Sequence, residues 1–238
     1  MSVAFDERSL RFEFDGRWQP ILKWDDHVAY RKGIHQVRGS KAMDFVGVCD
    51  NRFIYLIEAR DFRRHSSEKE EPPHLELERK VRDTIAGLIG AGRRPEHADE
   101  FGPLLKSLIG QTRIVVVLWN EQPPYSGATE VHRQRDVAGA GFLTERAKAN
   151  VKWLHARVIT TSQADRDKSI VPGLTVTNRA RKPRELGVAI LDLLKQRKIR
   201  IGEVTHARIA SHTNVEDLEV WLERAATVST IEALFDDH

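Results

Sequence analysis

The strongest constraint in this sequence is the run from Arg113 to Trp119, which reads Arg-Ile-Val-Val-Val-Leu-Trp. Apolar, mostly β-branched residues follow one another there without a polar position, which is the pattern of a strand buried on both faces of a sheet. The run is strand-sized and far shorter than the roughly 18–20 apolar residues that span a bilayer. We therefore expect this strand inside a sheet, and no association with a membrane.

The segments around this strand predict an α/β domain with a mixed β-sheet flanked by helices. Residues 42–48 and 52–60 read as two strands joined by a short turn, so an antiparallel hairpin is their natural pairing. Apolar residues at helical spacing follow at 75–88. After the buried strand come a helix at 143–154 and a further strand at 156–161.

The two ends of the chain predict additions to this core. Residues 9–14 alternate apolar and polar, Asp15-Gly16 is a strong turn signal, and residues 19–24 would return as an N-terminal hairpin. The C-terminal end holds helical patterns at 184–196 and 215–226. For 238 residues we expect a core over residues 1–180 and a C-terminal helical region over residues 181–238, which can belong to the same domain.

The apolar side of the last predicted helix, at 215–226, must be buried against another surface. Leu218, Trp221, Leu222 and Ala225 lie on this side. Packing against the chain's own domain is the more frequent solution, and a homodimer or a protein partner at these C-terminal helices is the alternative.

The cysteine count and the first residues indicate the cell compartment. One cysteine, Cys49, cannot form an internal disulfide, and no CxxC pair is present for zinc. The first eight residues include Asp6 and Glu7, where a signal peptide has a basic and then an apolar stretch. We therefore expect a cytoplasmic protein.

The charge of the chain is unevenly distributed. Residues 130–200 hold 16 Lys and Arg against 7 Asp and Glu, although the net charge of the whole chain is only +3. Such an excess indicates a surface for nucleic acid, because cations that neutralise phosphates supply most of the non-specific affinity. A solvated face balanced by the acidic remainder of the fold is the alternative.

The chemistry of the chain points to the predicted hairpin at 42–60. Asp44 interrupts the first strand, and Glu58 and Arg60 share one face of the second strand by alternation. Hairpin pairing can bring Asp44 beside Glu58. Two carboxylates at the edge of an apolar sheet repel each other unless a cation lies between them, and an oxygen-liganded ion such as Mg²⁺ is the usual solution.

This arrangement resembles the PD-(D/E)XK nuclease superfamily, whose restriction-endonuclease-like core is a helix, three antiparallel strands, a helix and a further strand. The resemblance rests on Ala42-Met43-Asp44-Phe45-Val46 and on Leu56-Ile57-Glu58-Ala59-Arg60, and covers roughly residues 24–120. It implies that Asp44 and Glu58 hold Mg²⁺ or Mn²⁺ and that Arg60 occupies the position of the motif lysine. Asp25 or Asp26 lies where the superfamily often places an extra acid.

Arginine at the lysine position is a departure from the motif. Its pKa lies far above neutral pH, so Arg60 can stabilise phosphate charge but cannot accept a proton. A relocated cation could compensate, and Lys41 and Arg63 flank the site in the sequence. The basic residues expected to contact nucleic acid are Lys41, Arg63, Arg179, Arg181 and Lys182.

The leading hypothesis is a metal-dependent nuclease that hydrolyses DNA, in genome defence or repair, with Asp44, Glu58 and Arg60 as its catalytic residues. A catalytically inactive nuclease-like module that binds nucleic acid or a protein is the alternative from another class. In a third interpretation Glu58 and Arg60 form an ordinary ion pair on a strand, and the protein is a partner-binding scaffold.

Overall fold

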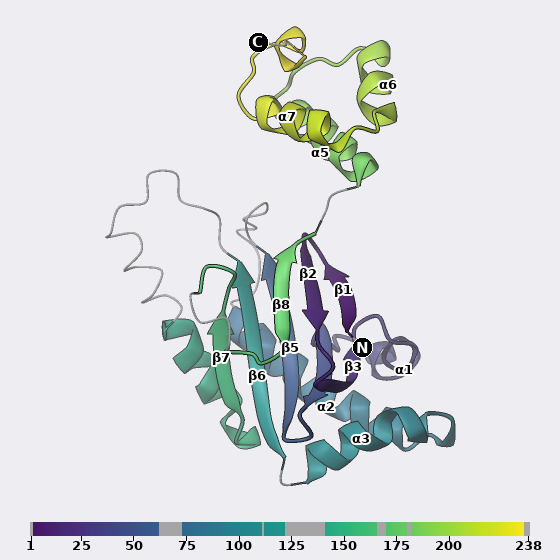
Figure 1. Cartoon of the computed structure of the whole chain (residues 1–238), viewed down its shortest axis with the longest axis vertical. Helices are drawn as coiled ribbons and strands as arrows, with labels where there is room; N and C mark the ends of the chain where they lie inside the picture. The colour runs from purple at the N-terminus through teal and green to yellow at the C-terminus, as the bar shows by residue number, and fades with distance from the viewer. Residues whose placement is uncertain are drawn as a thin grey trace. The chain divides into compact units, whose positions relative to one another are not determined.

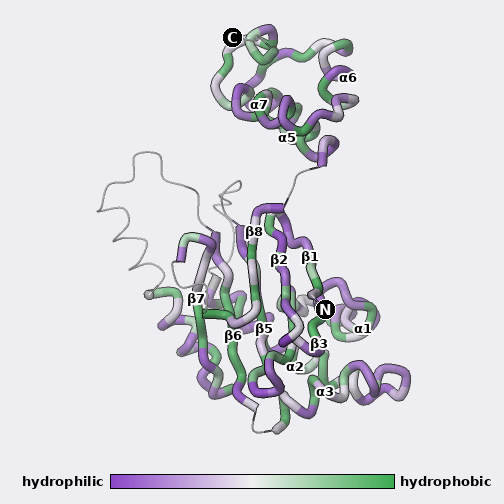
Figure 2. Tube along the Cα trace, viewed as in Figure 1, coloured by the Kyte–Doolittle hydropathy of each residue, from purple (hydrophilic) through white to green (hydrophobic). Residues whose placement is uncertain are grey.

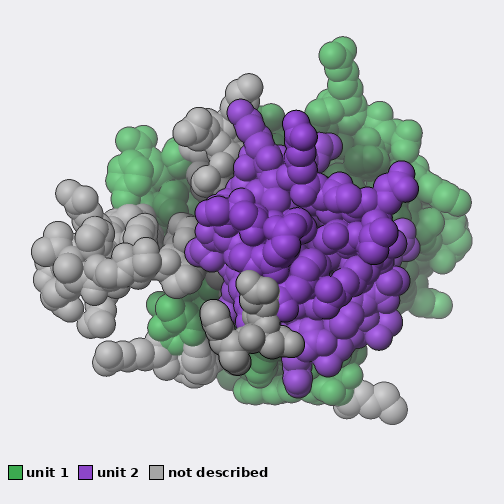
Figure 3. All heavy atoms as spheres, turned by 90° about the horizontal axis from the view of Figure 1, so that it is seen from above, with its two compact units in different colours: residues 1–178 green, residues 179–238 purple. Residues whose placement is uncertain are grey.

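A computed structural model of the chain describes residues 2–61, 73–110, 112–121, 141–165, 170–179 and 182–235. The chain divides into two compact units, Met1–Asn178 and Arg179–His238, which Figure 3 colours separately. Each unit is described by itself below.

The first unit is built on a five-stranded mixed sheet in the order β3-β4-β5-β6-β7. Its strands are β3 (Trp18–Lys23), β4 (Phe45–Cys49), β5 (Phe53–Asp61), β6 (Arg113–Glu121) and β7 (Arg157–Thr161). The pairs β3–β4 and β4–β5 are antiparallel, whereas β5–β6 and β6–β7 are parallel. The mixed α/β fold is therefore confirmed, with β6 buried inside the sheet as its sequence predicts.

Helices cover one face of this sheet, and α2 lies behind it in Figure 1. They are α1 (Val28–Arg31), α2 (Pro73–Gly92), α3 (Ala98–Ile109) and a helix over residues 141–150, with short 3-10 turns at Ile34–Gln36, Pro95–His97 and Lys152–Leu154. The apolar side of α2 packs here through Leu77, Val81 and Leu88, against Val46 and Leu56 of the sheet.

A second, three-stranded sheet covers the opposite face and lies in front in Figure 1. Its antiparallel strands are β1 (Val3–Glu7), β2 (Leu10–Phe14) and β8 (Leu174–Asn178), in the order β1-β2-β8. Phe12 and Phe14 point from β2 into the core between the sheets, where the ring centroid of Phe12 lies 4.9 Å from that of Phe45. Among the described residues of the first unit, helices therefore flank the main sheet on one side, and the second sheet covers the other.

The predicted pairing of residues 9–14 with 19–24 is wrong. The N-terminal hairpin is formed by β1 and β2, and β3 pairs with β4 in the other sheet. The turn at Asp15-Gly16 carries the chain from one layer to the next, because β2 buries its alternate residues between the sheets while β3 extends the main sheet.

The second unit consists of α5 (Pro183–Gln196), α6 (Glu203–Ser211), α7 (Val215–Ala225) and a 3-10 turn at Glu232–Leu234. Hydrophobic and hydrophilic residues alternate along its helices (Figure 2). Leu218, Trp221 and Ala225 are buried against Ile190 and Leu194 of α5. The apolar side of α7 is thus covered within its own unit, so it is not an open face for a homodimer or another partner.

No helix among the described residues is long and apolar enough to cross a membrane.

The self-contained core of the second unit yields a prediction. Residues 179–238 produced alone should give helical circular dichroism and a cooperative thermal transition, because their apolar side chains are buried against one another. Near-ultraviolet dichroism from Trp221, the one tryptophan of this segment, should vanish in the same transition. Leu218→Asp is the destabilised control, and a non-cooperative melt of the unsubstituted fragment would contradict its independence.

Candidate functional site

Asp44 and Glu58 face each other at one end of the β4–β5 ladder, next to its last pair, Phe45 and Ile57. The ladder places Phe45 opposite Ile57 and Val46 opposite Leu56, so Asp44, one residue earlier, lies opposite Glu58. Alternation puts both acids on the face that carries Val46 and Leu56, which is the face covered by α2. The hairpin predicted from the sequence is confirmed, and it brings the two acids together as expected.

Backbone hydrogen bonds fix Asp44 at this position. Its Oδ2 accepts a hydrogen bond from the amide of Ala59 at 2.6 Å, and its carbonyl accepts one from the amide of Trp24 at 2.8 Å. Asp44 is only 6% exposed. The β-ladder ends here because the side chain of Asp44 takes up the Ala59 amide.

Two polar side chains of α2 hold the segment that leads into Asp44. Thr84 Oγ1 accepts a hydrogen bond from the amide of Met43 at 2.9 Å, and Asp83 Oδ2 accepts one from the amide of Lys41 at 3.0 Å. Thr84 is fully buried. The position of Asp44 therefore depends on α2 as well as on the sheet.

Lys80 of α2 is a candidate site residue that the sequence did not point to. Its Nζ lies 2.6 Å from Glu58 Oε1, whereas Arg60 Nε lies 3.7 Å from the same oxygen. Glu58 is 2% exposed, so this ammonium is its closest counter-charge in a nearly dry position. The available signal was the spacing of Glu76 and Lys80, four residues apart on the predicted helix and each followed by a core residue.

Glu76 links the two other cations of the site. Its Oε1 lies 2.8 Å from Lys41 Nζ, and its Oε2 accepts a hydrogen bond from a terminal guanidinium nitrogen of Arg60. Burial by itself raises the pKa of Glu76, but the hydrogen bond from Lys41 and the charge of Arg60 outweigh it and lower the pKa to about 2. Lys41 and Arg60, both predicted from the sequence, thus belong to one ionic network.

A second group of acids adjoins Asp44. Oxygen atoms of Glu7, Asp25 and Asp44 all lie within 4.8 Å of one another. Glu7 comes from the end of β1, and its carboxylate is 2.7 Å from Lys23 Nζ. Burial, with Glu7 as the nearest like charge, raises the pKa of Asp25 to about 6. Asp25 was anticipated as an extra acid, and it lies just before α1. Asp26, the alternative, belongs neither to this acidic group nor to the ionic network around Glu58 and Glu76.

The electrostatics of the central acids follow from burial and from each other. Burial and the charge of Glu58 raise the pKa of Asp44 well above its usual range. Burial also raises the pKa of Glu58, although Lys80 opposes this shift. Burial lowers the pKa of Lys80, but the charges of Glu58 and Asp44 outweigh this and raise it, so the ammonium remains protonated at neutral pH.

The donor atoms present fit a hard divalent cation. Glu7, Asp25 and Asp44 offer only carboxylate oxygens, which Mg²⁺ and Mn²⁺ prefer. Asp25 Oδ1 and Glu58 Oε2 are buried and accept no hydrogen bond, so both retain capacity for a ligand. Of the two acids predicted as metal ligands, Asp44 belongs to this group and Glu58 does not; the anticipated extra acid Asp25 belongs to it, and Glu7 is the member that the structure adds.

The remaining basic residues expected to contact nucleic acid are Arg63, Arg179, Arg181 and Lys182. Arg63 and Arg181 lie outside the described residues. Arg179 and Lys182 belong to the second unit, where Arg179 pairs with Glu185 at 2.5 Å and Lys182 precedes the first turn of α5.

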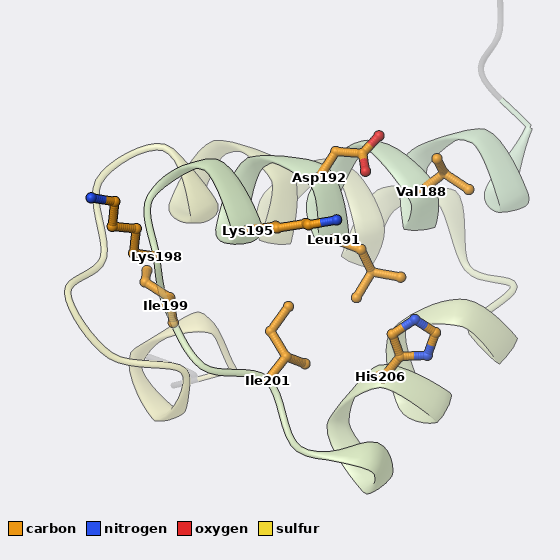
Figure 4. A pocket seen from close by; sticks show the side chains of 8 residues that line it. All are labelled: Val188, Leu191, Asp192, Lys195, Lys198, Ile199, Ile201 and His206. Carbon is orange, nitrogen blue, oxygen red and sulfur yellow. The ribbon is translucent and has the colours of Figure 1, made fainter.

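The second unit has a hollow of its own, of about 530 Å³, shown in Figure 4. Leu191, Ile199 and Ile201 point into it, with Lys195 and His206 at its sides. Among the described residues that line it, Asp192 is the one acid, so this hollow has no paired carboxylates.

Comparison of the chain with protein-family profiles, curated protein sequences and solved structures finds no match. The roles of these residues are therefore argued from their geometry.

The hydrogen bonds from Thr84 and Asp83 to the segment before Asp44 predict an effect on stability. Thr84→Val keeps the shape of the side chain but leaves the buried amide of Met43 without an acceptor, which should lower the free energy of unfolding by about 1–3 kcal/mol. Urea unfolding followed by circular dichroism measures this. Thr84→Ser retains the hydroxyl and should lose less; a larger loss for Thr84→Ser than for Thr84→Val would show that the methyl group, which only Thr84→Val keeps, contributes more than the hydrogen bond.

The raised pKa of Asp25 predicts a pH effect. Folded Asp25 holds its proton up to about pH 6, whereas the unfolded chain releases it near its ordinary pKa of 3.8, so stability should fall as pH rises between these values. Asp25→Asn should therefore have a higher Tm than the unsubstituted protein at pH 7.5 in EDTA, and the gain should shrink towards pH 4. The control is Asp99→Asn, at an exposed position on α3. A pH-independent gain would contradict the assignment.

Proposed function

We propose that this chain is a Mg²⁺- or Mn²⁺-dependent nuclease that hydrolyses phosphodiester bonds in DNA, with a restriction-endonuclease-like core of the PD-(D/E)XK type. The observation that carries the proposal is the contact of 2.6 Å between Lys80 Nζ and Glu58 Oε1, opposite Asp44. The resemblance calls for two acids and a lysine. Arg60 replaces that lysine in the sequence, but α2 supplies another lysine, Lys80, whose ammonium contacts the carboxylate of Glu58.

The order of the elements supports this proposal. The antiparallel pair β4–β5 carries the two acids, α2 crosses the same face, and β6 then joins β5 in parallel. The predicted core has a helix and a further strand after its acidic hairpin in the same order. This order places the side chains of α2 over the acids, which is why a lysine on that helix can serve the site.

In this proposal Asp44, Asp25 and Glu7 hold the metal ion, and Glu58 Oε2 is the further oxygen within the site. When bound, a divalent ion would lower the pKa of a water ligand and stabilise negative charge on a phosphate. The raised pKa of Asp25 and of Asp44 supports this assignment, because a cation would favour the ionised forms that burial disfavours.

Lys80 and Arg60 then have different roles. Lys80 is held protonated by Glu58 and Asp44, so it acts as a donor that orients a water or binds a phosphate oxygen, and not as a base. Arg60 is 4% exposed and bound by Glu76, so it acts as a fixed counter-charge that positions Glu58 and Glu76. The catalytic role first given to Arg60 thereby passes to Lys80.

One observation favours an inactive nucleic-acid-binding module instead. Lys80, Arg60 and Lys41 already offset Glu58 and Glu76 without any metal. In that case the network is a structural one, and the acids make no catalytic contribution.

Cleavage assays separate the two functions. Purified protein with Mg²⁺ or Mn²⁺ should cut plasmid and single-stranded circular DNA. Lys80→Met should reduce the rate by about 100-fold or more, as expected for loss of a donor to developing charge. Arg60→Lys, which keeps the charge, should cut within about tenfold of the unsubstituted rate. Lys106→Met, at an exposed position on α3, is the matched lysine control and should be unchanged.

Two outcomes would contradict the nuclease proposal. One is the absence of cleavage with either metal, together with DNA affinity that Asp44→Asn leaves unchanged or increases, because an acid near phosphates repels them. The other is cleavage that survives in the Asp44→Asn, Glu58→Gln double variant, which would place the activity elsewhere.

A further inference from the structure

The helix at residues 141–150 and the turn after it carry two exposed aromatic side chains. Phe142 is 57% exposed and Trp153 is 53% exposed, whereas Ala147 and Val151 on the opposite side are buried in the core. Phe142 and Arg146 lie one turn apart on the helix, and Trp153 lies in the 3-10 turn Lys152–Leu154 that follows it. The exposed residues Phe142, Arg146, Lys152 and Trp153 are called the stripe below, and no described residue buries either ring.

Cations accompany these rings. The guanidinium carbon of Arg146 lies 5.2 Å from the centroid of the Phe142 ring, and Lys148 and Lys152 are also exposed. Glu145 is the one acid between residues 141 and 153, and it pairs with Lys148 at 2.7 Å. The stripe thus combines aromatic surface with net positive charge, which fits a polyanion better than an apolar protein partner.

The helix at residues 141–150 packs on the face of the main sheet that carries Asp44 and Glu58, within the first unit. Thr144 Oγ1 hydrogen-bonds to Thr160 Oγ1 at 2.9 Å, and Thr160 is in register with Leu118, which is in register with Glu58. Two strand spacings, about 10 Å, therefore separate Thr160 from Glu58 along the sheet. At its other end the helix is bound to the first turn of α2, where Asn150 Nδ2 donates to the carbonyl of His74 at 3.1 Å.

We propose that this stripe binds single-stranded DNA, with bases stacked on Phe142 and Trp153 and phosphates against Arg146 and Lys152. The proposal rests on the nuclease function above and specifies its substrate as a single strand. Exposed rings gain stacking energy only from bases that are not stacked in a duplex. The rings are 11 residues apart in sequence, one at the start of the helix and the other in the turn after it, which suits separated bases of one extended strand.

Binding measured in EDTA tests the proposal without cleavage. Fluorescence anisotropy with the full chain should show tighter binding of a labelled mixed-sequence single strand than of its duplex. Phe142→Ala and Trp153→Ala should each weaken single-strand binding by about fivefold or more. Ile109→Ala, at a position 75% exposed on α3, is the matched control and should bind normally. Phe142→Tyr retains a ring and should bind like the unsubstituted chain.

Tryptophan fluorescence gives a second measurement. The other four tryptophans are at most 8% exposed, so quenching by bound single-stranded DNA should come from Trp153. Trp153→Phe should abolish the quenching and keep most of the affinity, because phenylalanine still stacks.

Three results would overturn the single-strand assignment: normal binding by both alanine variants, duplex bound as tightly as single strand, or RNA of the same sequence bound more tightly than DNA.

The nuclease proposal and the single-strand proposal can fail independently. Single-strand binding that needs both rings, without cleavage in either metal, supports the stripe and refutes the nuclease. Metal-dependent cleavage with normal single-strand binding by both alanine variants supports the nuclease and refutes the stripe.

Discussion

The burial of Asp44 opposite Glu58 is the constraint on which the first unit depends. Two carboxylates that are almost inaccessible to water would be very costly if both were ionised and unpaired. The amide of Ala59 satisfies one oxygen of Asp44, and the ammonium of Lys80 pairs with Glu58. The helix α2 therefore stabilises the sheet in two ways: Lys80 pairs with the buried carboxylate of Glu58, and its apolar side covers the sheet.

Both layers that cover the main sheet contribute side chains to the site around Asp44. The helical layer supplies Lys80 and Glu76, and the second sheet brings Glu7 to Asp25 and Asp44 through the end of β1. Lys80, Arg60 and Lys41 lie around Glu58 and Glu76, whereas Glu7, Asp25 and Asp44 gather beside them. In the proposed function, a metal ion would bind on the Asp25 side and a phosphate on the Lys80 side.

Much of the fold followed from local pattern. The hairpin at 42–60, the buried strand at 113–119 and the helix after residue 75 were predictable, because periodicity and β-branched runs report burial directly. The N-terminal pairing was not, since the turn at Asp15-Gly16 indicates a change of direction without saying which strand lies beside the next. The short helix α6 was also missed, because its apolar pattern is weak.

The sequence by itself determined two neighbouring strands joined by a short turn, with Asp44 on the first and with Glu58 and Arg60 on one face of the second, because alternation and a short connection are local properties. The register that sets Asp44 opposite Glu58 came with the paired strands. The tertiary structure alone decided which cation serves Glu58, because Lys80 reaches it across 22 residues of sequence, from a helix whose placement depends on packing. It also decided that Glu7 joins the acids, since that contact depends on how two sheets stack.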